Sequence, residues 1–349
     1  MSELYDFKTL SEQHTEILEN VLTGNGFSRH FHDEFSYGSL FDYIKETQKL
    51  REEEAKIFLE FQTQNFELVL NSLSNAKIIN NAFDKPIEHL NESYEKIKNL
   101  LIDSVNGIHP KRYEIEDLNE LAWCFYIFKK NIFTTNYDLL SYWALTEIYK
   151  AKRKDPYYIG DYFKGRYLTF NPEEFDEFKI KVHYLHGALH LFDIHGDIYK
   201  IKADKKEDIL TKVTKMYSDN KFPIYVAEGS SEEKVIQIKR NKYLSFCFKK
   251  FEEMKGGITI IGQSLEKKYD SHIIEAIKNS NVDHIAFGVY QTEEESAPYI
   301  MEKIKNHFKS SKKKIHFFDS HGFFDSVKKI AQEIKPGFGS YLEKFPDLK

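Results

Sequence analysis

Residues 131–138 read NIFTTNYD, and the fold prediction rests on this stretch. Ile132 and Phe133, with the two threonines that follow, are typical of a short buried strand. Asn136 and Asp138 come directly after it, where apolar periodicity resumes and a helix is expected. A carboxamide and a carboxylate therefore stand where a central strand passes into a helix. Open α/β sheets bind their ligands at this position.

Other apolar segments along the chain repeat this pattern of a strand followed by a helix. Such a repeat implies a parallel sheet that is covered by helices on both faces. We therefore predict an α/β fold with a doubly wound parallel sheet, in a single domain over residues 1–349. The expected strands lie within residues 17–28, 131–138, 181–192, 222–229, 257–263, 284–290 and 314–319. Within residues 181–192, the strand is expected to end at His186 and Gly187.

Residues 40–110 differ from the rest of the chain, because they are highly charged and contain hardly any glycine or proline. Within them, residues 50–73 and 87–105 place apolar side chains three and four positions apart, which predicts long amphipathic helices. We interpret the region as a helical insertion that covers the cleft or carries an oligomer interface. Further helices are expected over residues 114–129, 231–240 and 243–254, and a loop over the site is expected at 155–178.

The composition excludes several classes of function. The 349 residues carry a net charge of -5, whereas a duplex-binding protein needs a basic excess, so direct binding of nucleic acid is not expected. The two cysteines, Cys124 and Cys247, are too few for a four-thiolate zinc site and suit buried, reduced thiols in the cytoplasm. The first ten residues do not read as a signal peptide, and no apolar run is long enough to span a membrane.

Four short motifs stand at predicted strand ends: GNGFS at residues 24–28, TTNYD at 134–138, LHG at 185–187 and GQS at 262–264. Two glycines one residue apart after a strand allow a tight turn and a close approach of the backbone to a phosphate. In this order and strand context the motifs resemble the NAD-binding domain of sirtuins. Over about residues 15–325, without the insertion, the chain is similar to bacterial sirtuin-like proteins of antiphage defence that lack the zinc module.

The resemblance implies roles for three candidate catalytic residues. Asn136 would lie beside the nicotinamide ribose and order a water molecule, and Asp138 would recognise the nicotinamide carboxamide. His186 would act as the base on the ribose hydroxyls. The chemistry fits these residue types, because cleavage of the bond to nicotinamide builds oxocarbenium character and needs polar groups that hold the ribose and polarise water. A histidine can also accept a proton near neutral pH.

The same resemblance implies a set of NAD-binding residues. The glycine-rich turn would hold the pyrophosphate, the late Gly-x-Ser would contact phosphate and ribose, and the end of the last strand would hold the adenine half. These residues are Gly24, Asn25, Gly26, Phe27, Ser28, Thr135, Gly262, Ser264 and Asp319. NAD is thereby expected as the substrate, and no metal is expected.

Two departures from the sirtuin deacylases direct the functional prediction. The four-cysteine zinc module that helps build their acyl-peptide groove is missing, and their arginine-containing cofactor loop is not obvious in RHFHDEF, residues 29–35. Without an acyl-lysine, water is the natural acceptor, and the products are ADP-ribose and nicotinamide. We therefore predict an NAD glycohydrolase, a regulated antiphage effector that depletes NAD. The resemblance also implies a homo-oligomer or a partner protein such as a hexameric ATPase, docked on the insertion.

Several alternatives stay open at this point. The protein could be a non-catalytic sensor of NAD or ADP-ribose, or could transfer ADP-ribose to a protein or nucleic acid. Asn136 and Asp138 could cap the following helix, and His186 could be a structural histidine. A metal site built from His183, His186 and His190 is disfavoured, because that segment begins as a strand.

Overall fold

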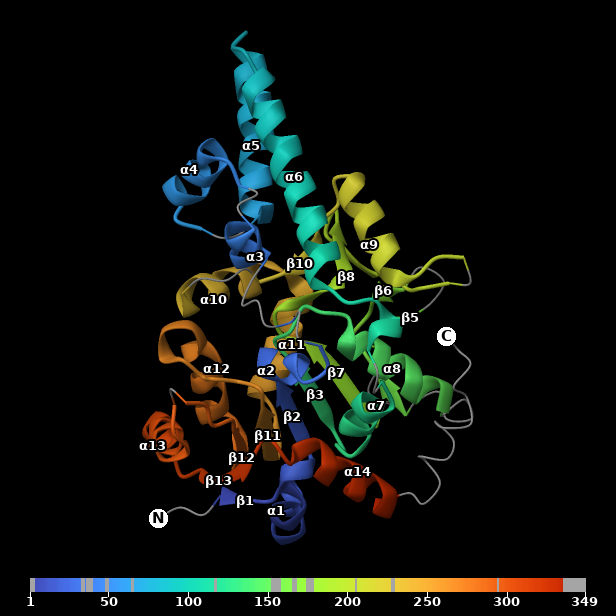
Figure 1. Cartoon of the computed structure of the whole chain (residues 1–349), viewed down its shortest axis with the longest axis vertical. Helices are drawn as coiled ribbons and strands as arrows, with labels where there is room; N and C mark the ends of the chain where they lie inside the picture. The colour runs from blue at the N-terminus through green and yellow to red at the C-terminus, as the bar shows by residue number, and fades with distance from the viewer. Residues whose placement is uncertain are drawn as a thin grey trace.

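The structure is a computed structural model. An eight-stranded parallel sheet forms its centre, and a five-stranded antiparallel sheet adjoins it (Figure 1). The residues that the structure describes are 4–32, 35, 40–47, 50–63, 66–115, 118–151, 158–164, 168–173, 179–204, 206–226, 230–293 and 295–334.

The order of the strands confirms the predicted doubly wound sheet. It runs β1-β13-β12-β11-β2-β3-β7-β4, and all neighbours are parallel. The six longer strands, counted along the chain from β2, lie in the order 6-5-4-1-2-3, which is that of dinucleotide-binding folds. The strands are β1 Leu4–Tyr5, β2 Asn20–Thr23, β3 Asn131–Thr134, β4 Ile159–Gly160, β7 Ile180–Tyr184, β11 Lys255–Ile261, β12 Asn281–Val289 and β13 Lys314–Asp319.

Helices cover both faces of this sheet, as the strand pattern predicts. Figure 1 shows α12 and α13 on one side of the strands and α7, α8 and α14 on the other. One layer consists of α1 Phe7–Gln13, α7 Leu118–Tyr126, α8 Leu140–Ala151 and α14 Phe323–Ile334, which follow one another in contact. The other consists of α10 Ser231–Arg240, α11 Lys242–Glu252, α12 Lys267–Asn279 and α13 Ala297–Phe308.

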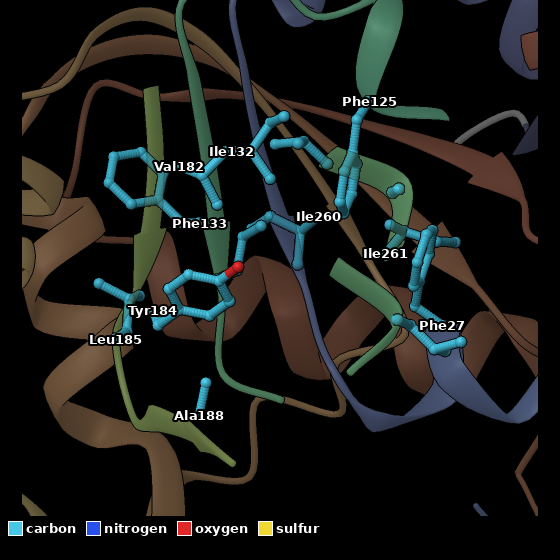
Figure 2. Packing of buried hydrophobic residues seen from close by; sticks show 14 of the residues in the cluster. Phe27, Phe125, Ile132, Phe133, Val182, Tyr184, Leu185, Ala188, Ile260 and Ile261 are labelled. Carbon is cyan, nitrogen blue, oxygen red and sulfur yellow. The ribbon is translucent and has the colours of Figure 1, made fainter. Parts of the chain in front are cut away.

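Strand β3, the NIFT part of the quoted stretch, lies in the middle of the core. Ile132 and Phe133 are completely buried, because helices cover the strand on both faces. Figure 2 shows them among Val182 of β7 and Ile260 of β11. Burial of such side chains contributes about 1.5–3 kcal/mol each relative to exposure, so this strand is a major source of stability.

The second sheet is a feature that the sequence analysis did not predict. Its order is β10-β8-β9-β6-β5 with antiparallel pairs. After β5 and β6 the chain passes through β7 and returns to this sheet by a turn at Leu185 and His186, where Gly187 has a φ of +83° that favours glycine. The strands are β5 Phe163–Lys164, β6 Thr169–Phe170, β8 Gly187–Ile194, β9 Asp197–Lys200 and β10 Pro223–Tyr225.

Two predictions about the segments around this sheet are corrected by the structure. The strand expected within residues 222–229 does form, as β10, but it pairs antiparallel with β8 and not within the parallel sheet; residues 227–229 lie outside the described part. The loop expected at 155–178 contains β4, β5 and β6 among its described residues. Its aromatic side chains explain the difference, because Phe163 and Phe170 pack against Tyr243 instead of covering the cavity.

The helical insertion projects from the sheet as a hairpin of α5 and α6 (Figure 1). Residues 50–73, expected to form one long helix, are interrupted, because Gln62 takes a left-handed conformation with a φ of +48°. The amide of Thr63 then donates to the carbonyl oxygen of Phe58 and ends the helix. Within the described ranges no helix is long and apolar enough to span a bilayer. The insertion contains α3 Leu40–Glu46, α4 Glu52–Glu60, α5 Phe66–Ala82 and α6 Glu88–Ile108.

Candidate functional site

The turns after β2 and β11 meet at the centre of the sheet, where the strand order reverses. The amide of Gly24 donates to the carbonyl oxygen of Ile261 (3.0 Å), and that of Gly26 donates to Gly262 (2.9 Å). Gly262 has a φ of +72°, and a Cβ there would lie 2.1 Å from the backbone nitrogen of Phe27. The glycines therefore let two turns pack backbone to backbone. A doubly wound sheet binds its ligand at this switch point.

A cavity of about 950 Å³ opens beside these turns, at the carboxyl edge of the sheet. Its volume lies within the range of small-molecule and cofactor sites. The structure brings all three predicted catalytic residues into it, together with most of the predicted binding residues. The predicted residues that line the cavity are Asn25, Gly26, Phe27, Thr135, Asn136, Asp138, His186, Gly262 and Ser264.

Three predicted binding residues are not among the described residues that line this cavity. Gly24 lies behind it, where an added Cβ would be 2.5 Å from the side chain of Gln263. Ser28 is fully buried. The carboxylate of Asp319 lines a separate surface pocket and accepts hydrogen bonds from the amide (3.0 Å) and ring Nδ1 (2.9 Å) of His321.

The carboxamide of Asn136 is held in one orientation. Its Nδ2 donates to the carbonyl oxygen of Gly24 (2.8 Å) and to the hydroxyl oxygen of Ser28 (2.6 Å). Because a carbonyl oxygen can only accept, Nδ2 must face Gly24 and Oδ1 must point the other way. Within the described residues Oδ1 makes no hydrogen bond. Since Asn136 lines the cavity, this oxygen is a fixed acceptor for a water molecule or a ribose hydroxyl.

The carboxyl group of Asp138 is held from both sides. The hydroxyl of Ser28 donates to Oδ2 (2.5 Å), and the amide of Leu140, at the start of α8, donates to Oδ1 (2.9 Å). Asp138 therefore caps the helix and lines the cavity at once. Burial raises the pKa of Asp138 to about 6, and the two hydrogen bonds oppose that shift. A cavity carboxyl group with a pKa near neutrality is typical of functional sites.

A chain of close polar contacts runs from Ser231 through His272 to His186. Nε2 of His186 lies 3.1 Å from Nε2 of His272, and Nδ1 of His272 lies 2.9 Å from the hydroxyl oxygen of Ser231. The backbone amide of His272 also donates to this oxygen (2.8 Å). Burial lowers the pKa of both histidines, that of His272 to about 4, so both rings are neutral at pH 7. Each neutral ring carries one proton, so a Ser231 hydroxyl that donates to Nδ1 of His272 leaves the proton of His272 on Nε2, where it is donated to His186. If the hydroxyl instead accepts from Nδ1, Nε2 of His272 accepts a hydrogen from Nε2 of His186.

The helical insertion forms one wall of the cavity through Phe41, Val105 and His109. His109 follows α6 and accepts the amide hydrogen of Leu139 at Nε2 (2.8 Å), while its Nδ1 lies 2.8 Å from the carbonyl oxygen of Pro110. These two contacts fix the ring proton on Nδ1. Burial lowers the pKa of His109 to about 4. The insertion thus contacts the segment that carries Asn136 through a neutral, oriented ring.

The far end of the cavity contains residues that the sequence analysis missed. Tyr290 and His321 follow β12 and β13, and their rings stack with centroids 4.8 Å apart. Lys303 of α13 lines the same part of the cavity. The rule that singled out Asn136, a polar side chain directly after a strand, applies equally to His321 and to the hydroxyl-bearing Tyr290. No such rule points to His272, because it lies inside α12.

Histidines with the geometry of a metal site gather elsewhere. Among the described residues, one group of histidine, cysteine and acidic side chains could hold an ion. The set of His183, His186 and His190 is not that group, and His183 is instead buried with Nε2 3.1 Å from Oδ1 of Asn131. Cys124 is also buried, as expected. The group, named here the amino-edge histidines, is His14, His284 and His316.

Comparison with known proteins identifies the family of this chain. The model of a family described as "Domain of unknown function (DUF4917)" matches residues 21–323. The match covers most of the chain, from β2 to the end of β13 with the insertion between, and the chain therefore belongs to the DUF4917 family. A search of the curated proteins finds no match.

Proposed function

We propose that this member of the DUF4917 family hydrolyses NAD to ADP-ribose and nicotinamide in the cytoplasm. The observation that carries the proposal is the fixed carboxamide of Asn136, which shares one cavity with Asp138 and His186. This cavity lies at the switch point of a doubly wound sheet, where dinucleotides bind. The resemblance of the four motifs to sirtuins supports the same ligand.

The reaction breaks the bond between C1′ of the ribose and the nicotinamide nitrogen. The bonding electron pair leaves with nicotinamide, and positive charge develops on the ribose. The oxygen of a water molecule then bonds to C1′, and this water releases one proton. Oδ1 of Asn136 can hold the water by accepting one of its hydrogens, which positions the nucleophile. The negative end of the same carbonyl dipole also favours the developing positive charge.

Asp138 and His186 can bind the two groups that this bond joins, the nicotinamide and the ribose. Above its pKa of about 6, Asp138 is a carboxylate that can accept a hydrogen bond from the nicotinamide carboxamide. The neutral ring of His186 can accept a hydrogen bond from a ribose hydroxyl. Ser28 has a different role from the expected phosphate contact, because its hydroxyl joins Asn136 to Asp138.

The far end of the cavity suits the adenine half of NAD. The ring of Tyr290 is 59% exposed and stacked on His321, so it offers an aromatic face for a base. Lys303 also lines the cavity, where its ammonium group is paired with Glu266 (2.6 Å) and Glu295 (3.5 Å). Asn136 and Tyr290 follow β3 and β12, which lie three positions apart in the sheet, or about 14 Å at roughly 4.8 Å per strand. A ligand that reaches both favours a dinucleotide over a mononucleotide.

A second copy of the chain is proposed to contact the insertion, in keeping with an oligomeric defence effector whose activity is restrained until it is triggered. Helix α5 exposes Ile78 (67%) and Ile79 (55%), and Phe83 follows it with 72% exposed. Grouped exposed apolar side chains mark interaction sites. Sedimentation should show a smaller species for Ile79→Asp than for wild type; equal sizes would exclude this contact. A hexameric ATPase partner is proposed on the resemblance alone.

The test of the hydrolase is NAD consumption by the purified chain, with nicotinamide and ADP-ribose quantified. Asn136→Ala and His186→Ala are compared with wild type and with Asn281→Ala, an exposed control at the start of β12. Wild type and control should release equal amounts of the two products. Both site variants should lose at least about 100-fold in rate with unchanged circular dichroism.

Other outcomes would overturn the proposal in distinct ways. Wild type that binds NAD at high protein concentration without consuming it would be a sensor. Label from NAD that appears on a macromolecule would show transfer of ADP-ribose. Activity that persists in both site variants would place the reaction away from Asn136.

A further inference from the structure

We propose that the amino-edge histidines bind a divalent transition-metal ion, with Zn²⁺ as the best fit, at a site separate from the cavity. The three rings come from three elements that are distant in the sequence. His14 follows the last residue of α1, His284 lies in β12 and His316 lies in β13. An ion there would join the first helix to two strands of the parallel sheet.

The register of the strands explains why two of the rings meet. His316 pairs with Ala286 across β12 and β13, so His284, two residues earlier, lies diagonally next to it on the same face of the sheet. His14, at the end of α1, packs its ring against the rings of His284 and His316. Its ring centroid lies 4.0 Å from that of His316 and 5.1 Å from that of His284.

The spacing of the ring nitrogens is close to that of a zinc site. Nδ1 of His284 lies 3.1 Å from Nε2 of His316, and one nitrogen from each of the three rings lies within 4.8 Å of the others. A tetrahedral Zn²⁺ with Zn–N bonds of about 2.0–2.1 Å places its ligand nitrogens about 3.4 Å apart. Two rings therefore already have nearly this spacing, and the ring of His14 needs to move by at most about 1.4 Å.

The surroundings also suit an ion. All three rings are partly exposed, which leaves room for a water molecule as the fourth ligand. Burial and the neighbouring rings lower the pKa of His316 to about 4, and the neutral ring is the form that ligates metals. The carboxylate of Glu16 adds a nearby negative charge, while Lys314 adds an opposing positive one.

The position argues for a structural role. His284 precedes Tyr290 by six residues on one extended segment, so the two ends are about 20 Å apart at roughly 3.3 Å per residue. Zn²⁺ at the amino edge therefore cannot contact NAD in the cavity. The proposal accordingly stands or falls independently of the hydrolase.

The test is a calorimetric titration of the tag-free chain with ZnCl₂ after a chelator has removed bound metal. Wild type should bind one ion, and saturation should raise its melting temperature by about 5 °C. His284→Ala and His316→Ala should lose about 100-fold in affinity while melting in chelator as wild type does. His89→Ala, an exposed histidine of α6, and His186→Ala in the cavity are matched controls that should bind as wild type does.

Bound Co²⁺ gives a second measurement that does not depend on stability. Its visible absorption bands should appear on wild type and change in His14→Ala. Absence of Zn²⁺ binding by wild type, unchanged affinity in His284→Ala and His316→Ala, or loss of binding in His186→Ala would each overturn the proposal.

Discussion

The two edges of the parallel sheet both gather histidines, but in opposite surroundings. At the carboxyl edge His186 and His272 are buried, and Ser231 fixes how their protons are shared. At the amino edge the rings of His284 and His316 are partly exposed and face each other. A buried ring with a directed proton suits a reaction on a bound substrate, whereas converging accessible nitrogens suit an ion. Burial and partners, not residue type, decide the role of a histidine here.

The largest expected effect comes from removing one histidine at each edge. His186→Ala should reduce NAD hydrolysis by at least about 100-fold and leave Zn²⁺ affinity unchanged. His316→Ala should weaken Zn²⁺ binding and leave NAD hydrolysis unchanged, because the rings of His186 and His316 lie at opposite ends of the strands. Both assays should be run on both variants. A folded variant that loses both functions would show that the two edges are coupled.

A smaller effect is expected from the residues behind His186. His272→Ala should lower kcat by about 10- to 100-fold with little change in KM, because His272 orients the ring and does not line the cavity. His272→Gln should recover part of the rate, since its side-chain oxygen can still accept the Nε2 hydrogen of His186 and leave Nδ1 free to accept from a ribose hydroxyl. Ser231→Ala, which removes the hydroxyl that holds His272, should also lower kcat, and Ser218→Ala, at an exposed serine of α9 (Ile209–Ser218), is its control. A change in KM alone would mean that His272 shapes the cavity and does not position a proton.

The features that the sequence predicted are those set by local pattern. The buried strand of Ile132 and Phe133, and the polar residues after it, could be predicted because strand periodicity and strand ends are local signals. The glycine turns at Gly26 and Gly262 were also predicted at strand ends, but their contact depends on the order of the strands in the sheet, which local patterns do not give.

The features that it missed depend on pairing between distant segments. β8 continues directly from β7, and alternation along a strand does not say in which sheet the strand lies. β10 was assigned to the wrong sheet for the same reason, because its partner is some thirty residues earlier. His272 reaches His186 only because α12 packs against α10, which carries Ser231. No pattern around residue 272 contains that information.

The smallest expected effect is a difference in pH dependence between the edges. Asp138 has a pKa of about 6 in the folded protein, against a reference value of 3.8. Between these values the folded state holds more protons than the unfolded state, so this group lowers stability as pH rises from about 4 to 6. His316 has the opposite sign, because its pKa is lowered from 6.5 to about 4 and its contribution to stability falls as pH drops through that window.

Asp138→Asn separates these two contributions. The variant should be more stable than wild type at pH 7 by up to about 3 kcal/mol, and the difference should vanish below about pH 4. It should also lack the rise of kcat/KM for NAD through about pH 6 that ionisation of Asp138 gives wild type. Urea unfolding and initial rates from pH 4 to 8 measure both, with Asp325→Asn on the exposed side of α14 as control. A variant less stable than wild type at pH 7 would mean that Ser28 and Leu140 outweigh burial and keep Asp138 ionised throughout.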